Sequence, residues 1–325
     1  MTTGLIQSSI ERLIASYRYS YGFQKLEYGE LIADVARVAF KHISKSDAPY
    51  HDVEHTVLVA LAGAEILRGK QITEGNVSPE DWLHAIASLL LHDIGYVKGV
   101  CRQDKLDARC FDTGIGGEMI SLPPDATDAS LTPYHVDRGK LFAKENFSHH
   151  KLLDIKTLQR NIELTRFPVP PDAEHEDTID YPGLARAADL IGQLADPLYL
   201  KKMKALFREF EEIGTNKVLG YRTIADLRAG YPNFFWGVVY QYLGGGLQHL
   251  KVTKSGQIIV ENLYENVKIV ERELSKSTAD SPQSAANGKS SNAGDRLPDP
   301  DAAETAHSAT SDQRSTSAMA NKYLT

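Results

Sequence analysis

The chain has 325 residues, of which 42% are hydrophobic, and this is enough for a substantial core in one large or two small domains. Its formal charge of -7 and pI near 5.9 argue against a nucleic-acid polymer as the main partner. No apolar stretch approaches the roughly twenty residues of a membrane span, and the N-terminus lacks the pattern of an export signal. With only two cysteines, we expect a cytoplasmic protein without a membrane partner.

Apolar residues recur at helical spacing along most of the chain, which predicts an all-α fold. The clearest helix start is the segment 78–81, where Ser78 can cap the helix, Pro79 suits the first turn and two acids complement the dipole. In chain order, the predicted helices cover residues 5–18, 28–44, 53–69, 79–96, 134–146, 154–165, 180–195, 198–213, 222–229, 232–249 and 256–275.

Two segments interrupt or follow these helices. Residues 99–131 are rich in Gly, Asp and Pro and show no clear period, which predicts a long loop. Because this loop leaves the helix that ends in His92 and Asp93, we expect it to serve as a lid or substrate-selecting loop, or to be a plain insertion. From Lys276 onward the residues are mostly small and polar, and they cannot bury enough surface to offset the entropy of ordering. We therefore expect one domain over 1–275 and a disordered tail over 276–325.

Three of the predicted helices carry histidine or aspartate among apolar residues. His51 and His55 lie four residues apart in APYHDVEHT, so on a helix they would share one face. His92 and Asp93 end the apolar run SLLLHD, and Asp189 lies at the centre of LARAADLIG.

Each of these residues taken alone is more often a satisfied core histidine or an ion-pair partner than a ligand. Taken together, they form a set of imidazoles and carboxylates that suits zinc, manganese, iron or magnesium. Ligation would also offset the free-energy cost of burying polar groups. The pattern therefore predicts a divalent-metal site.

The same segments resemble the metal-dependent phosphohydrolases of the HD superfamily, and they are most similar to its class I cyclic-nucleotide phosphodiesterases. The resemblance rests on YHDVEHT, LLLHDIG and RAADLIGQLADPLYLKKMKALFREFEEIG, which occur in the right order between about Tyr50 and Gly214. It implies two divalent ions, with Asp93 bridging them, and it implies His51 as the general acid that protonates the leaving oxygen. The segment PYHVDRGKLF resembles a further histidine motif of that family, which implies that His135 lies near the site. The ligands implied for the first ion are His55, His92, Asp93 and Asp189.

The sequence departs from the phosphodiesterase pattern at two places. Asp52 stands where that family has asparagine, which adds a negative charge beside His51. The family reads its purine with a glutamine three residues before a phenylalanine. Our alignment puts that phenylalanine near Phe235 and the glutamine position on Pro232, whose side chain cannot make the hydrogen bonds. The metal chemistry is thus expected to transfer, and the cyclic-nucleotide specificity is not.

The chemistry implied is hydrolysis by a metal-activated water. Two ions bridged by a carboxylate can lower the pKa of a shared water, which then attacks phosphorus in line. Arg138, three residues after His135, is the first candidate for a phosphate-binding cation, and its alternative is a surface salt bridge. Lys140 and Arg166 are weaker candidates.

Two functions fit these residues. The first is a metal-dependent phosphohydrolase acting on a small phosphodiester or a nucleotide. The second is a non-catalytic HD module that binds a nucleotide and signals through its tail. A module without catalysis would be free to lose the ligands or the acid, and this chain keeps all five positions. The substrate, the choice between diesterase and monoesterase, the native metal and the oligomeric state stay open at this point.

Overall fold

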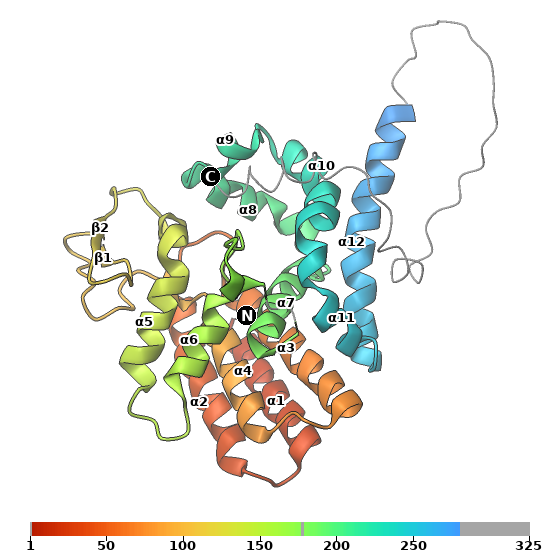
Figure 1. The fold of residues 1–325 in the computed structure, drawn as a ribbon. Coiled ribbons are helices and arrows are strands. Elements are labelled where there is room, and N and C mark those ends of the chain that lie inside the picture. The colour runs from red at the N-terminus through yellow and green to blue at the C-terminus, as the bar shows by residue number, and fades with distance from the viewer. Residues whose placement is uncertain (1, 177–178, 280–325) are drawn as a thin grey trace, which may run out of the picture.

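The computed structural model describes residues 2–176 and 179–279, and most of them are helical (Figure 1). The prediction of an all-α fold is confirmed, because the only strands in these two ranges form one short hairpin. Among the same residues, no helix is both long enough and apolar enough to cross a bilayer. In chain order the α-helices are α1 (Thr2–Tyr21), α2 (Leu26–Ile43), α3 (Val53–Glu74), α4 (Pro79–Leu91), α5 (His135–Phe147), α6 (Ile155–Glu163), α7 (Tyr181–Leu194), α8 (Tyr199–Glu212), α9 (Thr215–Leu219), α10 (Ile224–Phe234), α11 (Gly244–Leu250) and α12 (Lys254–Ala279).

Helix α3 is the central element and packs against α1, α4, α7 and α11. Small and apolar residues lie on all of its sides, which suits a helix surrounded by others. The crossing with α7 is close, because a Cβ atom at Gly192 would lie only 2.7 Å from the Cα atom of Val59. His55 and Asp189 lie about one helical turn from these two residues. The close crossing therefore brings the start of α3 beside the middle of α7.

Helix α4 begins at the predicted helix start, and Ser78 and Asp81 form a capping box there. The Ser78 side chain accepts a hydrogen bond from the Asp81 amide, and the Asp81 carboxylate accepts one from the Ser78 amide. The helix ends at Leu91, so the prediction that it continues to residue 96 is wrong for the last turn. His92 and Asp93 follow the helix directly.

After this pair the chain makes a 3₁₀ turn, η1 (Ile94–Tyr96), which packs against α5. A Cβ atom at Gly95 would lie 1.9 Å from the carbonyl oxygen of His135, so only glycine permits this approach. The turn therefore holds Asp93 near the beginning of α5.

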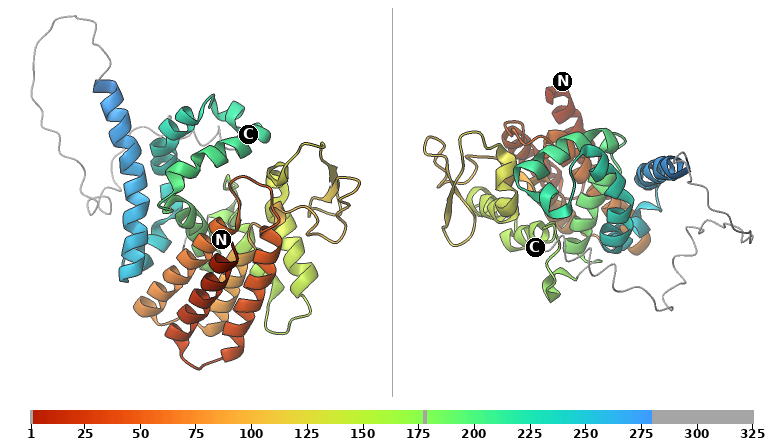
Figure 2. Two further views of the ribbon diagram at one scale, coloured as in Figure 1. Left: turned by 180° about the vertical axis from the view of Figure 1, so that it is seen from behind. Right: turned by 90° about the horizontal axis from the view of Figure 1, so that it is seen from above.

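The predicted loop 99–131 contains strands β1 (Cys110–Asp112) and β2 (Met119–Ser121), which pair antiparallel. The 3₁₀ segment η2 (Asp128–Tyr134) begins before the end of this loop and leads into α5. Both views of Figure 2 place this hairpin and α12 on opposite sides of the molecule.

The C-terminal helices depart most from the predictions. The predicted helix 232–249 is divided into the end of α10, a π-helical turn η4 (Phe235–Val239), a 3₁₀ turn η5 (Tyr240–Tyr242) and α11. Pro232 and three successive glycines at 244–246 lower the helix propensity of this stretch. Helix α12 ends at Ala279, so the predicted boundary at 275 falls inside a helix, and the rest of the predicted tail lies outside the described residues.

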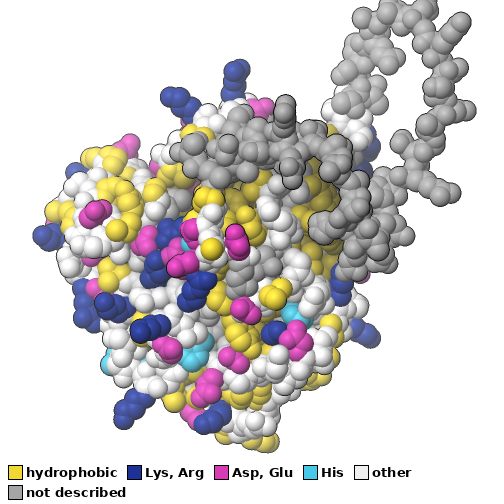
Figure 3. All heavy atoms as spheres, viewed as in Figure 1, with side chains coloured by type: hydrophobic (Ala, Val, Ile, Leu, Met, Phe, Trp, Pro, Cys, Tyr) yellow, Lys and Arg dark blue, Asp and Glu magenta, His cyan; other side chains and the backbone are white. Residues whose placement is uncertain are grey.

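The surface carries both signs of charge. On the face drawn in Figure 3, basic and acidic side chains of the described residues are interspersed. The acidic side chains that give the chain its net negative charge therefore do not form one continuous patch on this face.

Candidate metal centre and adjoining pocket

The predicted ligand residues come together at the meeting point of α3, α4 and α7. The Asp93 Oδ2 atom lies 3.0 Å from His55 Nε2 and 3.1 Å from His92 Nε2. The Asp189 Oδ1 atom lies 3.5 Å and 3.4 Å from the same two nitrogens. Two imidazoles and two carboxylates thus converge on one point from three elements that are distant in sequence.

Local structure fixes the position of the first histidine. Asp52 is the N-cap of α3 and accepts a hydrogen bond from the His55 amide at 3.0 Å, so His55 lies in the first helical turn. The expectation that His51 and His55 share one face of a helix is therefore wrong, because His51 precedes the helix start. Its ring centroid still lies 5.3 Å from that of His55. The role of Asp52 as a cap also explains an acid at this position.

The orientation of His92 suits a metal ligand. Its Nδ1 atom lies 2.7 Å from the Leu89 carbonyl oxygen and donates its proton there, which leaves the Nε2 lone pair directed at the cluster. His92 Nε2 and Asp93 Oδ2 are buried, and despite their short separation neither makes a hydrogen bond of acceptable geometry. Unpaired lone pairs of this kind fit a shared divalent cation, and the donor set could hold manganese, zinc, iron or magnesium.

Without a bound cation, the electrostatics of the cluster favour charged groups, and the histidines would release their Nε2 protons when those nitrogens bind a metal. Burial disfavours the imidazolium of His55, but the neighbouring Asp189 and Asp93 carboxylates outweigh it and raise the pKa of His55 to about 9. Burial likewise disfavours the Asp189 carboxylate, but the nearby His92 and His55 lower its pKa to about 2. Two negative carboxylates therefore face the point where a cation would bind.

A hydrogen-bonded pair of His51 and Glu209, which the sequence did not predict, lies beside the cluster. The Glu209 carboxylate accepts a hydrogen bond from His51 Nδ1 at 2.6 Å and further bonds from the backbone amides of Tyr50 and His51. Burial lowers the pKa of His51, but the charge and hydrogen bond of Glu209 outweigh burial and raise it. The sequence does contain a signal for this acid. Glu209 follows Leu206 by three residues on the apolar face of α8, and this position predicts a buried carboxylate.

Tyr96 is the other residue that the sequence did not reveal. Its ring is stacked between His51 and His135, with centroids 4.4 Å apart on each side. His135 Nδ1 donates to the Thr132 carbonyl oxygen at 2.6 Å, and His135 Nε2 lies 4.0 Å from Asp93 Oδ1. His135 is thus found near the cluster, and the three stacked rings form one side of the site.

Arg138 does not face this site, and its assignment as a phosphate-binding cation is wrong. The side chain is fully buried and donates to the carbonyl oxygens of Gly95 and Val97 and to the Asp104 carboxylate. Its role is structural, because it fastens the start of the 99–131 segment to the turn after α4.

The two weaker cation candidates are also engaged elsewhere. Lys140 and Arg166 both form ion pairs with Asp137 and Glu163. Neither lines the pocket described below. The sequence-based candidates thus supply no cation for a phosphate.

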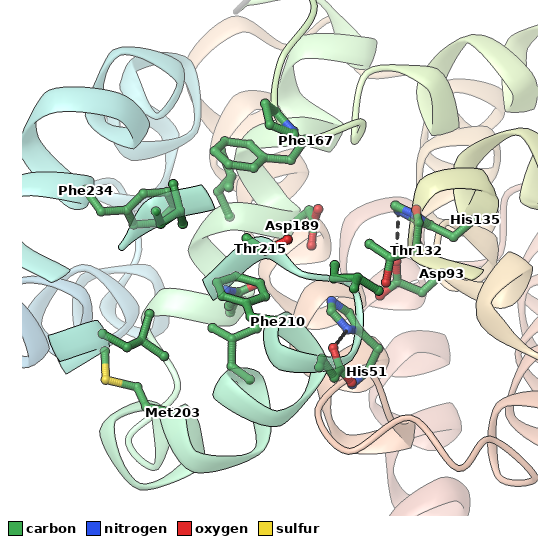
Figure 4. Close-up of a pocket in the computed structure, with 18 of the residues that line it drawn as sticks. His51, Asp93, Thr132, His135, Phe167, Asp189, Met203, Phe210, Thr215 and Phe234 are labelled. Carbon is green, nitrogen blue, oxygen red and sulfur yellow. Dashed lines mark hydrogen bonds and ion pairs between the residues drawn. The ribbon is translucent and has the colours of Figure 1, made fainter. Parts of the chain in front are cut away.

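The cluster opens into a pocket of about 210 Å³. Figure 4 shows its two sides: Asp93, Asp189, His51 and His135 on one, and the rings of Phe167 and Phe234 on the other. None of residues 99–131 lines the pocket. The segment 99–131 therefore contributes no side chain to the pocket, which favours a plain insertion over a lid.

The phenylalanine of the pocket wall is the neighbour of the one that the sequence comparison chose. Phe234 lines the pocket, whereas Phe235 is fully buried and does not. The position three residues before the pocket phenylalanine is therefore Tyr231, which also lines the pocket, and not Pro232. A phenol still differs from the glutamine of the phosphodiesterases, because it offers one hydroxyl in place of an amide.

Comparisons with known proteins identify a family. No curated protein and no solved structure matches the sequence. A family model described as Npun_R2479-like matches residues 1–273, which include every element that contributes to the cluster and the pocket. The chain therefore belongs to the Npun_R2479-like family.

Proposed function

We propose that this protein is a metal-dependent phosphohydrolase that acts on a small phosphate ester. The observation that carries the proposal is that the candidate metal cluster and the His51–Glu209 pair open into the same pocket. A metal site and a proton donor beside one cavity are the parts that hydrolysis of a phosphate ester requires.

His55, His92, Asp93 and Asp189 would hold the ions. When bound, divalent ions supply Lewis-acid stabilisation of phosphate oxygens and a nucleophile from water at neutral pH. The buried cluster positions these groups before substrate arrives, because the α3–α7 crossing and the turn after α4 fix their backbones.

His51 would act as the general acid. Its Nδ1 proton is held by Glu209, so the Nε2 proton of the imidazolium is the one available to a leaving oxygen. Glu209 stabilises the charged form, and Tyr96 stacks on the ring and limits its rotation. The alternative, a module that binds a nucleotide without catalysis, gives this buried pair no role.

An activity screen tests the proposal. The purified protein is assayed with manganese, magnesium and zinc on cyclic mononucleotides, cyclic dinucleotides, nucleoside monophosphates and bis(4-nitrophenyl) phosphate. We expect hydrolysis of the aryl phosphodiester with at least one ion. Stoichiometric metal binding without hydrolysis of any member would contradict the proposal and would favour the binding module.

A further inference from the structure

The charges around the pocket limit the substrate. Among the described residues, the charged or titratable side chains of the pocket wall other than tyrosine are histidines and acids, and no lysine or arginine is among them. Any cationic help must therefore come from the ions and from protonated histidine. A single phosphate group can be neutralised in this way, but the additional phosphates of a polyphosphate would meet no cation.

The wall opposite the metal cluster is aromatic and aliphatic. Phe167, Phe210 and Phe234 come from three different segments and are each only half-buried, while Met203 and Leu206 behind them are buried. The rings of Phe167 and Phe234 meet edge to face with centroids 5.8 Å apart. Ring surface that remains exposed inside a concave pocket is surface that an apolar ligand would cover.

Two of the hydroxyl side chains that line the pocket bond to the backbone of the protein itself. The hydroxyl groups of Thr132 and Thr165 donate to the backbone carbonyls of Ala129 and Ile162. Gln193 and Tyr199 both line the pocket, and the Gln193 side chain lies near the Tyr199 hydroxyl.

The Tyr231 hydroxyl is buried and has no hydrogen-bond partner among the described residues. A nucleobase presents several donors and acceptors, and the three phenylalanine side chains of this wall offer no polar atom to pair them. Burying those groups unpaired against the rings would be unfavourable, so this wall disfavours a base.

We propose that the pocket takes a phosphate ester whose organic group is bulky, uncharged and mainly apolar, with the phosphate at the cluster and the organic group against the three phenylalanine rings. This inference rests on the proposed phosphohydrolase function and replaces the nucleotide expected from the sequence. The volume of about 210 Å³ exceeds that of an engineered cavity of about 150 Å³ that binds benzene, so a fused two-ring group is a suitable probe.

Three diesters with the same leaving group isolate the contribution of the pocket. They are the 4-nitrophenyl phosphodiesters of methanol, of 2-naphthylmethanol and of the 5′ hydroxyl of thymidine. In each, water adds to phosphorus, the bond to 4-nitrophenolate breaks, and the other alcohol remains as a phosphate monoester. We expect kcat/KM for the naphthylmethyl ester to exceed that for the methyl ester by on the order of 100-fold, because a fused ring buries a large apolar area. The value of kcat/KM for the thymidine ester should stay within about 10-fold of that for the methyl ester. Its nucleoside surface is largely polar, so its burial contributes little favourable free energy.

Matched variants locate the effect in the aromatic wall. Phe234→Ala should reduce the preference for the naphthylmethyl ester by about 10-fold or more, since it removes ring surface from the contact. Phe23→Ala removes the same ring from a site that is 90% exposed and far from the pocket wall, and it should leave the preference unchanged. An equal effect of the two variants would contradict the assignment.

A binding measurement separates this inference from the proposed function. Calorimetry compares 2-naphthylmethylphosphonate with methylphosphonate, neither of which can be hydrolysed at its P–C bond. Tighter binding of the naphthyl compound, with a negative heat-capacity change, is expected whether or not any diester is turned over. Hydrolysis of all three diesters at equal rates with equal binding of the two phosphonates would overturn the inference and leave the phosphohydrolase intact. Preferential naphthyl binding without any hydrolysis would instead remove the proposed function.

Discussion

The two walls of the pocket differ in how far the protein has fixed their side chains. On the side of the candidate metal cluster, His55, His92 and Asp93 are almost fully buried and lie in short contact with one another. On the opposite side, Phe167 and Phe234 are only half-buried and touch each other through ring edges. Under the proposed function, we expect the chemistry to depend on the buried wall and the choice of substrate to depend on the half-buried wall. Changes to the first should affect every substrate, and changes to the second should alter selectivity.

The largest effect is expected for Asp93→Ala. It removes the carboxylate that lies closest to both His55 and His92, and it should abolish measurable turnover and most of the bound metal. Metal content by mass spectrometry and turnover of an aryl phosphodiester are the measurements. Asp34→Ala, at an exposed position on α2, is the control and should behave like wild type. Full metal content with full activity in the Asp93 variant would refute the cluster.

His51→Ala should leave the metal content near that of wild type. It should lower turnover by about 10²–10⁴-fold on a substrate with an alkoxide leaving group, because the general acid is lost. The loss should be much smaller with 4-nitrophenolate, which departs without protonation. Equal losses on the two substrates, or a parallel loss of metal, would show that His51 is a ligand or a structural residue.

Glu209→Gln should have a smaller effect, of about 10-fold on turnover of the alkoxide substrate. The carboxylate raises the pKa of His51, so its removal lowers that pKa. Because the acid works only when protonated, the alkaline limb of the pH–rate profile should move to lower pH. In a His51→Ala background the same change should have no further effect. An unshifted profile, or additive losses, would contradict the pairing.

The smallest effect is expected outside both walls, at Glu163, close to the segment that carries Phe167. Burial raises the pKa of Glu163, but Arg166 and Lys140 outweigh burial and lower it to about 2. The carboxylate therefore contributes stability above its unfolded pKa of about 4.3, and this contribution is lost as the pH falls towards 2. Glu163→Gln should lower the free energy of unfolding by about 2 kcal/mol at pH 7 and by less at pH 3. Urea unfolding at both values checks this, and a loss that is larger at pH 3 would be the wrong sign.

The helices and the four side chains that converge in the candidate cluster could be predicted from the sequence because both depend on short-range spacing. Ser78 and its neighbours define a helix start locally, and His92 and Asp93 stand out against an apolar run. Predicting the cluster required only the assumption that such side chains meet inside a helical core. The end of α4 was misjudged because the apolar pattern continues through Ile94, while the polar pair turns the chain out of the helix.

The missed residues depend on contacts between distant segments. Glu209 is 158 residues from His51, so their pairing is visible only once α8 lies beside the start of α3. Tyr96 reads as an ordinary core aromatic until two histidine rings are found on its faces. Arg138 was placed at the substrate because sequence gives no sign that the backbone carbonyls after α4 would enclose its guanidinium.

Removal and return of metal tests the central claim most directly. The protein is stripped with a chelator and assayed on bis(4-nitrophenyl) phosphate, and manganese, magnesium or zinc is then added back in measured equivalents. The account predicts loss of turnover and a lower Tm on stripping, and recovery of both as the ions are returned in stoichiometric amounts. Turnover that persists in full after the metal has been removed, as verified by mass spectrometry, would contradict it.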